Sequence, residues 1–173
     1  VRVRVVRMTG QTMRRRKATA EPAIGAADAE DARLLALELA GLAPERQIDQ
    51  IGVRVVLEPG ERAPRATVAR LWWWQGAWVG GVDCTLVVTD RRLIVRMPDA
   101  SLGSLWWGSM VGFEADLNRG QVVVDFGDGS PRLLMGSGTA VVAVAGVAAL
   151  YGIPALSGHP ALAPLRQIGP GRP

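Results

Sequence analysis

A short polar block between two aliphatic runs constrains the fold of this chain more than any other feature. Residues 84–97 read CTLVVTDRRLIVRM, so the polar residues 89–92 separate two runs of aliphatic side chains. Alternating aliphatic side chains are typical of strands with one buried face, and the polar block fits the tight turn of a hairpin. We therefore expect Arg91 and Arg92 to point to water at the hairpin tip. The residues expected to face the core are Leu86, Val88, Leu93 and Val95.

Further strand-like segments surround this hairpin at intervals of about 8–12 residues. Turns rich in Gly, Asn and Asp separate them, among them residues 118–120 and 127–130. This spacing predicts an antiparallel barrel or sandwich, so the expected fold class is mainly β with helices. The expected strands are residues 53–57, 66–74, 85–89, 93–97, 110–117, 121–126 and 132–135.

Two helices are expected outside these strands. The first, at 27–44, has acidic residues in its first turn, where they complement the helix dipole, and Gly41 near its end. The second runs from Thr139 to Tyr151, with Ser137 or Thr139 as its cap. It is uncharged but shorter than the ~20 residues that a bilayer requires, so it is predicted to be a buried helix. The apolar stripe of the first helix is Leu34, Leu35, Leu37, Leu39 and Leu42.

The positive charge of the chain is concentrated at its N-terminus. The formal net charge is +4, yet residues 1–17 hold seven of the 20 basic residues and no acidic one. Such an arm suits contact with nucleic acid or anionic lipid, but nothing else in the sequence is typical of a nucleic-acid reader, so nucleic acid is not expected as a partner. Residues 1–26 are predicted to be a disordered basic arm, and the Pro- and Gly-rich residues 153–173 an extended tail. Cys84 is the only cysteine, which fits a reducing compartment, so a cytoplasmic location is expected.

Four short motifs occur in a fixed order before the closing helix: residues 60–61 (GE), 86–93 (LVVTDRRL), 104–113 (SLWWGSMVGF) and 125–129 (DFGDG). In this order they resemble the bacterial pleckstrin-homology-like (PH-like) and GRAM-like domains. The resemblance covers about residues 53–152, which define the predicted PH-like domain. It implies a curved, nearly orthogonal pair of antiparallel sheets capped at one end by the C-terminal helix. It also implies a binding or assembly module without catalysis, often a platform for oligomerisation.

The motifs that suggest chemistry are incomplete. Residues 125–127 (DFG) match a metal-binding motif of kinases, but the chain has no His-Arg-Asp sequence and Lys17 is its only lysine. Residues 136–139 (GSGT) lack the lysine of a phosphate-binding loop. Cys84 and His159 are the only thiol and imidazole, and His159 lies in the tail. We therefore expect no catalytic residues, no metal site and no cofactor, and we expect that the protein is not an enzyme.

Six tryptophans are the most unusual feature of the composition. Since successive side chains of a strand point to opposite faces, the three at 72–74 cannot all enter one core. Together with Trp78 and either Trp106 or Trp107, they are expected to form an apolar surface. Three covers fit such a surface: the leucine stripe of the first helix, a protein partner or second copy, or a lipid interface. The candidate binding residues are Trp72, Trp73, Trp74, Trp78, Trp106 and Trp107.

These observations predict a non-enzymatic binding or scaffolding module that mediates protein–protein contact or self-association. The alternative is a peripheral membrane module that binds lipid through the tryptophan-rich loop and the basic arm. In that alternative the cytoplasmic protein is also located at a membrane surface.

Overall fold

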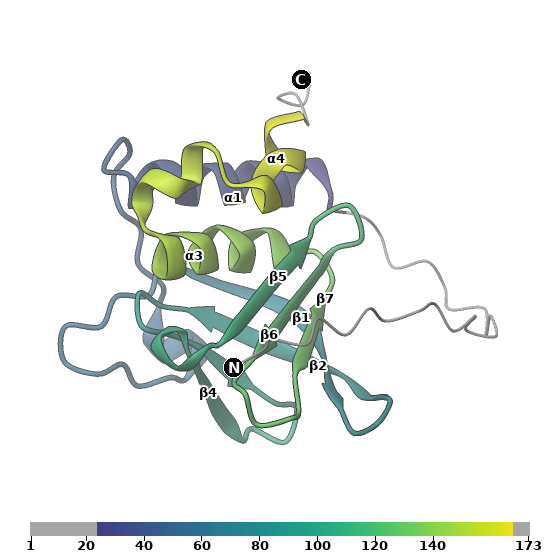
Figure 1. Cartoon of the computed structure of the whole chain (residues 1–173). Helices are drawn as coiled ribbons and strands as arrows, with labels where there is room; N and C mark the ends of the chain where they lie inside the picture. Colours follow the sequence, from purple (N-terminus) through teal and green to yellow (C-terminus); the bar gives the residue numbers. More distant parts are fainter. Residues whose placement is uncertain (1–23, 168–173) are drawn as a thin grey trace, which may run out of the picture.

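Seven antiparallel strands form one curled sheet in the computed structural model of the chain, which describes residues 24–167. The strands are β1 (Arg65–Trp74), β2 (Trp78–Val88), β3 (Arg92–Arg96), β4 (Leu102–Trp106), β5 (Gly112–Asp116), β6 (Gln121–Asp125) and β7 (Arg132–Met135). Their order, β4-β3-β2-β1-β7-β6-β5, confirms the mainly β class with helices (Figure 1). Residues 1–23 and 168–173 lie outside the described residues, so the disordered basic arm and the end of the extended tail stay predictions.

Strand β1 joins two meanders of the sheet. It pairs with β2 along its whole length, but it pairs with β7 only over residues 70–73. Strands β2, β3 and β4 continue the sheet on one side of β1, and β7, β6 and β5 continue it on the other. In Figure 1, β5, β6 and β7 run steeply across the view while β1 and β2 run closer to its horizontal. The sheet therefore curls and has a concave and a convex face.

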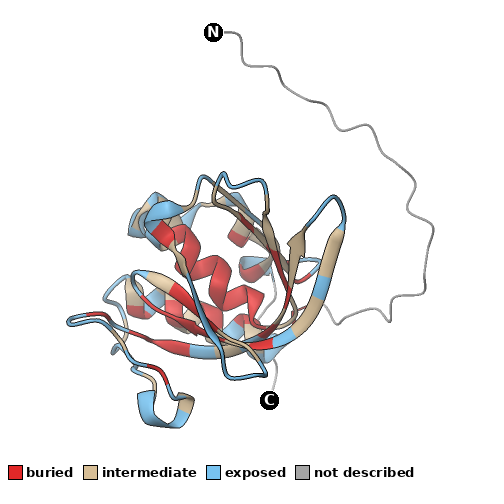
Figure 2. Cartoon of the chain, turned by 90° about the horizontal axis from the view of Figure 1, so that it is seen from below, coloured by how far each residue is buried: buried red, intermediate tan, exposed pale blue. Residues whose placement is uncertain are grey.

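Helix α3 (Thr139–Tyr151) fills the concave face. Its residues 139–147 are all buried, and Figure 2 shows this buried helix enclosed by the curved strands. Alanine and valine dominate its sequence, and the burial of these side chains offsets the modest helix propensity of valine. The predicted limits and burial of the helix are confirmed. Its predicted cap is wrong, because Gly138 occupies the N-cap position and neither Ser137 nor Thr139 makes a capping bond.

A second helical layer lies on the side of α3 that faces away from the sheet (Figure 1). Helix α1 (Ala26–Leu39) packs on α3, and α4 (Ala163–Gln167) packs on α1. The prediction of an extended tail is wrong for residues 153–167, because Leu162 and Leu165 are buried in the main core. The remaining 3-10 turns are η1 (Trp107–Ser109), η2 (Ile153–Ser157) and η3 (Pro160–Leu162).

Helix α1 buries a different face from the predicted leucine stripe. Leu35 is fully buried, but Leu37 is 42% exposed and Leu42, beyond the helix end, is 75% exposed. Gly41 follows the helix in a left-handed conformation (φ +72°), so the helix is shorter than the predicted 27–44. Small side chains at a spacing of three allow close approach to the Ala-rich α3. The buried residues of α1 are Ala29, Ala32, Leu35 and Glu38.

The segment between α1 and β1 covers part of the convex face. Residues 53–57, predicted as the first strand, form no strand: Val53 ends the short helix α2 (Gln50–Val53), and Arg54 follows with a left-handed φ of 53°. The alternation of valines in this segment reflects packing onto β2 and β3 rather than strand pairing. This second core comprises Val55, Ala63, Val87 and Ile94, with Ile48, Val53 and Leu57 packed against it.

Candidate functional site

The three consecutive tryptophans of β1 divide between the two faces of the sheet, as predicted. Trp73 packs against the main core on the concave side, two residues after the buried Leu71. Trp72 and Trp74 therefore point to the convex face. All three side chains are half-buried, so the sheet does not leave any of them fully exposed.

Two glycines of β2 form a bulge beside these rings. The register between β1 and β2 shifts between Leu71 and Trp72, where Gly80 and Gly81 have φ values of +105° and +74°. A Cβ at Gly81 would lie 2.7 Å from the Trp72 ring, and a Cβ at Gly80 would lie 2.7 Å from the Trp73 ring. The glycines thus leave room for one indole ring on each face of the sheet.

Trp74 and Trp78 meet at the tip of the β1–β2 hairpin. They are a cross-strand pair, and their rings make an edge-to-face contact with centroids 5.3 Å apart. The turn residues 75–77 between them are exposed. The indole Nε1 of Trp72 is buried and has no hydrogen-bond partner among the described residues, which is uncommon for a buried donor. The hairpin tip is therefore an aromatic site with one unused donor beside it.

Trp106 and Trp107 lie at the other end of the sheet. Trp107 is only 3% exposed, and its Nε1 donates to the carbonyl of Thr89 at 3.0 Å. Trp106 lies against the guanidinium of Arg92, whose central carbon is 4.6 Å from the ring centroid. Trp72 pairs with Gly80 near the start of β2, whereas Arg92 follows the end of β2. Roughly 25 Å of strand therefore separates the tryptophans of the β1–β2 hairpin from Trp106 and Trp107. The prediction of one continuous tryptophan surface is wrong.

One of the three covers considered for the tryptophans, the leucine stripe of the first helix, is contradicted for Trp72 and Trp74. Helix α1, with Leu34, Leu35 and Leu39, packs on α3 and α4, and α3 lies between it and the sheet (Figure 1). Trp72 and Trp74 point to the convex face, which is turned away from α3. No described leucine of α1 therefore reaches them.

The two arginines of the β2–β3 hairpin have different environments. Arg91 is exposed, as predicted, and pairs with Glu58 at 3.1 Å. The prediction is wrong for Arg92, whose guanidinium donates hydrogen bonds of 2.9 and 2.8 Å to the fully buried carboxylate of Glu61. The hydroxyl of Thr89 donates to the same carboxylate at 2.8 Å. The hydrogen bonds from Arg92 outweigh the effect of burial and lower the pKa of Glu61 to about 2.

A second buried ion pair joins α1 to the start of β1. Arg65 donates two hydrogen bonds of 2.9 Å to Glu38, and these side chains are 7% and 2% exposed. Arg65 also donates to Asp31 at 2.9 Å, and Arg46 pairs with Glu38 at 2.9 Å. The hydrogen bonds from Arg65 hold the pKa of Glu38 below its ordinary value. The sequence signal for this pair was the position of Glu38, three residues after Leu35 on the buried face of the helix.

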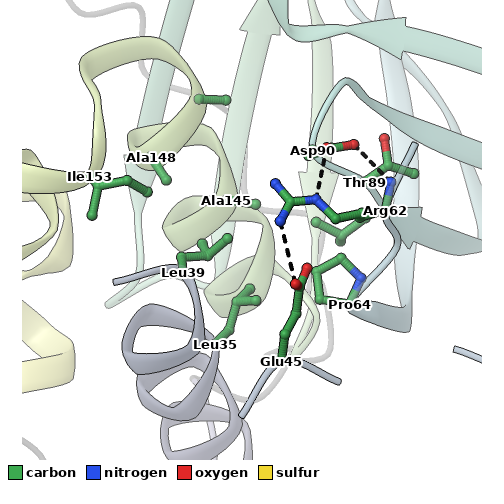
Figure 3. Close-up of a pocket in the computed structure, with 12 residues that line it drawn as sticks. Leu35, Leu39, Glu45, Arg62, Pro64, Thr89, Asp90, Ala145, Ala148 and Ile153 are labelled. Atoms are coloured by element: carbon green, nitrogen blue, oxygen red, sulfur yellow. Dashed lines mark hydrogen bonds and ion pairs between the residues drawn. The ribbon is translucent and has the colours of Figure 1, made fainter. Parts of the chain in front are cut away.

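A pocket of about 150 Å³ lies between α1, α3 and the tip of the β2–β3 hairpin (Figure 3). Leu35 from α1 and Ala145 from α3 belong to its apolar wall. Arg62 spans the rim and pairs with Glu45 at 3.3 Å and with Asp90 at 3.2 Å. A volume of this order accommodates one apolar ring or branched side chain. The Arg62 guanidinium at the rim is already paired with both neighbouring carboxylates.

The thiol and the imidazole occupy separate environments. Cys84 is buried in the sheet, where burial raises the pKa of its thiol to about 11 and its S–H donates to the carbonyl of Ala69 at 3.3 Å. His159 lies in the tail, where its Nδ1 accepts from the amide of Ala161 and its ring contacts Tyr151. Within residues 24–167, no group of three or more His, Cys, Asp or Glu side chains is placed to hold a metal ion. Over the same residues, no helix has the length and apolar character needed to cross a membrane.

No protein-family model matches the chain, and no curated protein matches it. Among solved structures, the C-terminal domain of an unknown protein from Leishmania infantum is similar, with a TM-score of 0.37 and 13% sequence identity. The similarity covers 53% of this chain and 85% of that one.

Proposed function

We propose that the protein is a non-enzymatic binding or scaffolding module that acts by contact with a protein partner or with a second copy of itself. The filling of the concave face carries this proposal, because α3 occupies the space in which a substrate cavity would otherwise lie. The buried Glu61–Arg92 and Glu38–Arg65 pairs hold elements of the fold together. Large apolar side chains remain at the surface: Leu42, Ile51, Val56, Val68, Leu102 and Val111.

We also propose that the sheet has the PH-like form, a pair of packed antiparallel sheets. The division into two meanders joined through β1 supports this, as does the position of α3 directly after β7. Two of the motifs that carry the resemblance are in contact, since Glu61 accepts hydrogen bonds from Thr89 and Arg92. A crystal structure tests the proposal through the angle between the two meanders. Nearly perpendicular strand directions support it, and parallel alignment contradicts it.

The mass of the full chain in solution tests the proposed function. Light scattering over a wide concentration range is expected to show a mass above that of the monomer if the chain associates with itself. If the chain binds another protein, its purification from the native host should yield a complex of fixed stoichiometry. A monomeric mass at every concentration, together with no such complex, contradicts the proposal.

The aromatic hairpin tip favours a second candidate function, binding to a lipid surface. Trp74 and Trp78 form a ring pair beside exposed turn residues, and tryptophan is enriched at membrane interfaces. Co-sedimentation with phosphatidylserine and phosphatidylcholine vesicles tests this candidate. The W74S/W78S double variant should lose vesicle binding, whereas W106S, at the other end of the sheet, should retain it. Equal binding by both variants contradicts a role for the tip.

A further inference from the structure

The two edge strands of the sheet differ in how well they are protected from pairing with another strand. Strand β5 carries Glu114 and Asp116 at one edge, and the turn Pro160–Leu162 packs against it. Strand β4, at the other edge, reads Leu-Gly-Ser-Leu-Trp and contains neither a charge nor a proline. In the part of the chain that the structure describes, β4 pairs with β3 alone. Free N–H and C=O groups of such an edge recruit another strand, which most proteins prevent with charges, prolines or a covering element.

The side chains of β4 leave space for a neighbouring strand. Leu102 is 53% exposed, and Gly103 and Ser104 are also exposed. A Cβ at Gly103 would meet no atom within 4 Å. Because side chains alternate along a strand, Leu102, Ser104 and Trp106 share the convex face, where Arg92 holds the Trp106 ring in place.

We propose that β4 pairs in antiparallel orientation with β4 of a second copy of this chain, about a two-fold axis at Ser104. This inference rests on the self-association form of the proposed function and names its surface. In this register Leu102 lies opposite Trp106 of the partner subunit, and Gly103 lies opposite Leu105 of the partner subunit. The exposed Leu102 of one copy thus packs beside Trp106 of the partner subunit, and Gly103, which has no side chain, leaves space for Leu105 of the partner subunit. The strand is therefore complementary to itself.

The charges next to β4 do not oppose this pairing. Strand β3 carries Arg92 and Arg96, and both guanidinium groups have partners within their own chain. Arg92 pairs with Glu61, and Arg96 donates to the carbonyls of Val53 and Arg54. The two-fold contact therefore buries no unpaired charge, which would otherwise weigh against a dimer.

Two further apolar side chains are exposed in the segment that Arg96 contacts. Arg96 ties the α2 segment to the end of β3, opposite Leu102 in the β3–β4 ladder. This segment carries Ile51 and Val56, which are 88% and 87% exposed. These side chains would add to the contact if the second copy reaches beyond β4.

A pair of lysine substitutions tests the surface with the full chain. L102K places a charge on the proposed contact, whereas V111K places the same charge at an exposed valine next to β5, at the opposite edge. Both positions are exposed, so both variants should keep the far-UV spectrum of the wild type. We expect the wild type and V111K to be dimers and L102K to dissociate about tenfold more readily or to be monomeric, as measured by analytical ultracentrifugation.

Cysteine substitutions test the register. Ser104 faces its own copy across the axis at a Cα separation of about 4.5–5.5 Å, which a disulfide can bridge. S104C should therefore form a covalent dimer on mild oxidation, and G103C, which faces Leu105 of the partner subunit, should do so poorly. The native Cys84 is only 5% exposed and should not interfere.

The outcomes separate the inference from the proposed function. A wild-type dimer that persists in L102K, or that forms no covalent dimer through S104C, overturns β4 pairing but leaves self-association in place. A wild-type chain that is monomeric at every concentration overturns both β4 pairing and self-association. A dimer lost in L102K, kept in V111K and covalently trapped in S104C supports the inference.

Discussion

The carboxylate of Glu61 and the guanidinium of Arg92, 31 positions apart in the chain, form an ion pair through two hydrogen bonds of 2.9 and 2.8 Å. The pair fastens the segment before β1 to the β2–β3 hairpin. Arg92 extends the connection to β4, because it also donates to the Ser104 hydroxyl at 3.0 Å and lies against the Trp106 ring. The hairpin that first indicated the fold is thus fixed at its tip by charge as well as at its base by apolar packing.

Removing the charge of Glu61 should destabilise the fold strongly. E61Q keeps the shape of the side chain but leaves the guanidinium of Arg92 without its counter-charge, so we expect the free energy of unfolding to fall by about 2–4 kcal/mol. E58Q is the matched control, because Glu58 pairs with Arg91 at the surface and should contribute less than about 1 kcal/mol. Guanidinium chloride unfolding measures both. Equal losses for the two variants would contradict a special role for the buried pair.

Stability should also fall in acid. The folded-state pKa of Glu61, about 2, is below its ordinary value of 4.5, so its stabilisation is present above pH 4.5 and is lost as the pH falls towards 2. The difference between these pKa values corresponds to about 3 kcal/mol at neutral pH. Glu38 acts in the same direction, since its pKa is also lowered. Unfolding curves from pH 7 to pH 2 should show the wild type converging on E61Q, whereas a constant difference between them would contradict this account.

The sequence pattern alone was sufficient to predict the elements in which apolar side chains recur with a single period. The alternation of Leu86, Val88, Leu93 and Val95 placed the β2–β3 hairpin correctly, and all four side chains are in the main core. The glycines and prolines around α3 marked its limits. The same alternation misled at 53–57, because a period of two reports which side chains are buried and not whether the backbone pairs with a neighbour.

Relationships that depend on the order of strands could not be read from the sequence. Alternation separated Trp73 from Trp72 and Trp74, but only the sheet shows that Trp106 lies at the opposite end of β2. The role of Arg92 was missed for a similar reason. An arginine in a turn is ordinarily solvated, and the carboxylate that binds it lies far away in the chain.

The folded tail should contribute to stability, in contrast to the extended tail expected from its composition. Leu165 is 4% exposed, and the guanidinium of Arg33 donates to its carbonyl at 2.8 Å, so L165A should lower the free energy of unfolding by about 2–3 kcal/mol. L42A provides the control, because Leu42 is 75% exposed and its truncation should have little effect. Urea unfolding compares the two variants. Similar small effects would mean that the tail does not pack on α1 in solution.

The bulge beside the tryptophans allows ring packing to be separated experimentally from backbone strain. Gly76 and Gly81 have nearly the same left-handed φ, +76° and +74°, so an alanine at either position should cost about 1 kcal/mol through the backbone alone. A Cβ at Gly76 meets no atom within 4 Å, whereas one at Gly81 would lie 2.7 Å from the Trp72 ring. We therefore expect G81A to lower the free energy of unfolding by about 1–3 kcal/mol more than G76A, since the ring must move. Replacing the ring in the same chain isolates this term: in a W72L background the difference between G81A and G76A should largely disappear, because a smaller side chain leaves room for the Cβ. The near-UV spectrum of G81A should change as well, and that of G76A should not. A difference that survives in W72L would assign the cost to the backbone of the bulge and not to the indole that it carries.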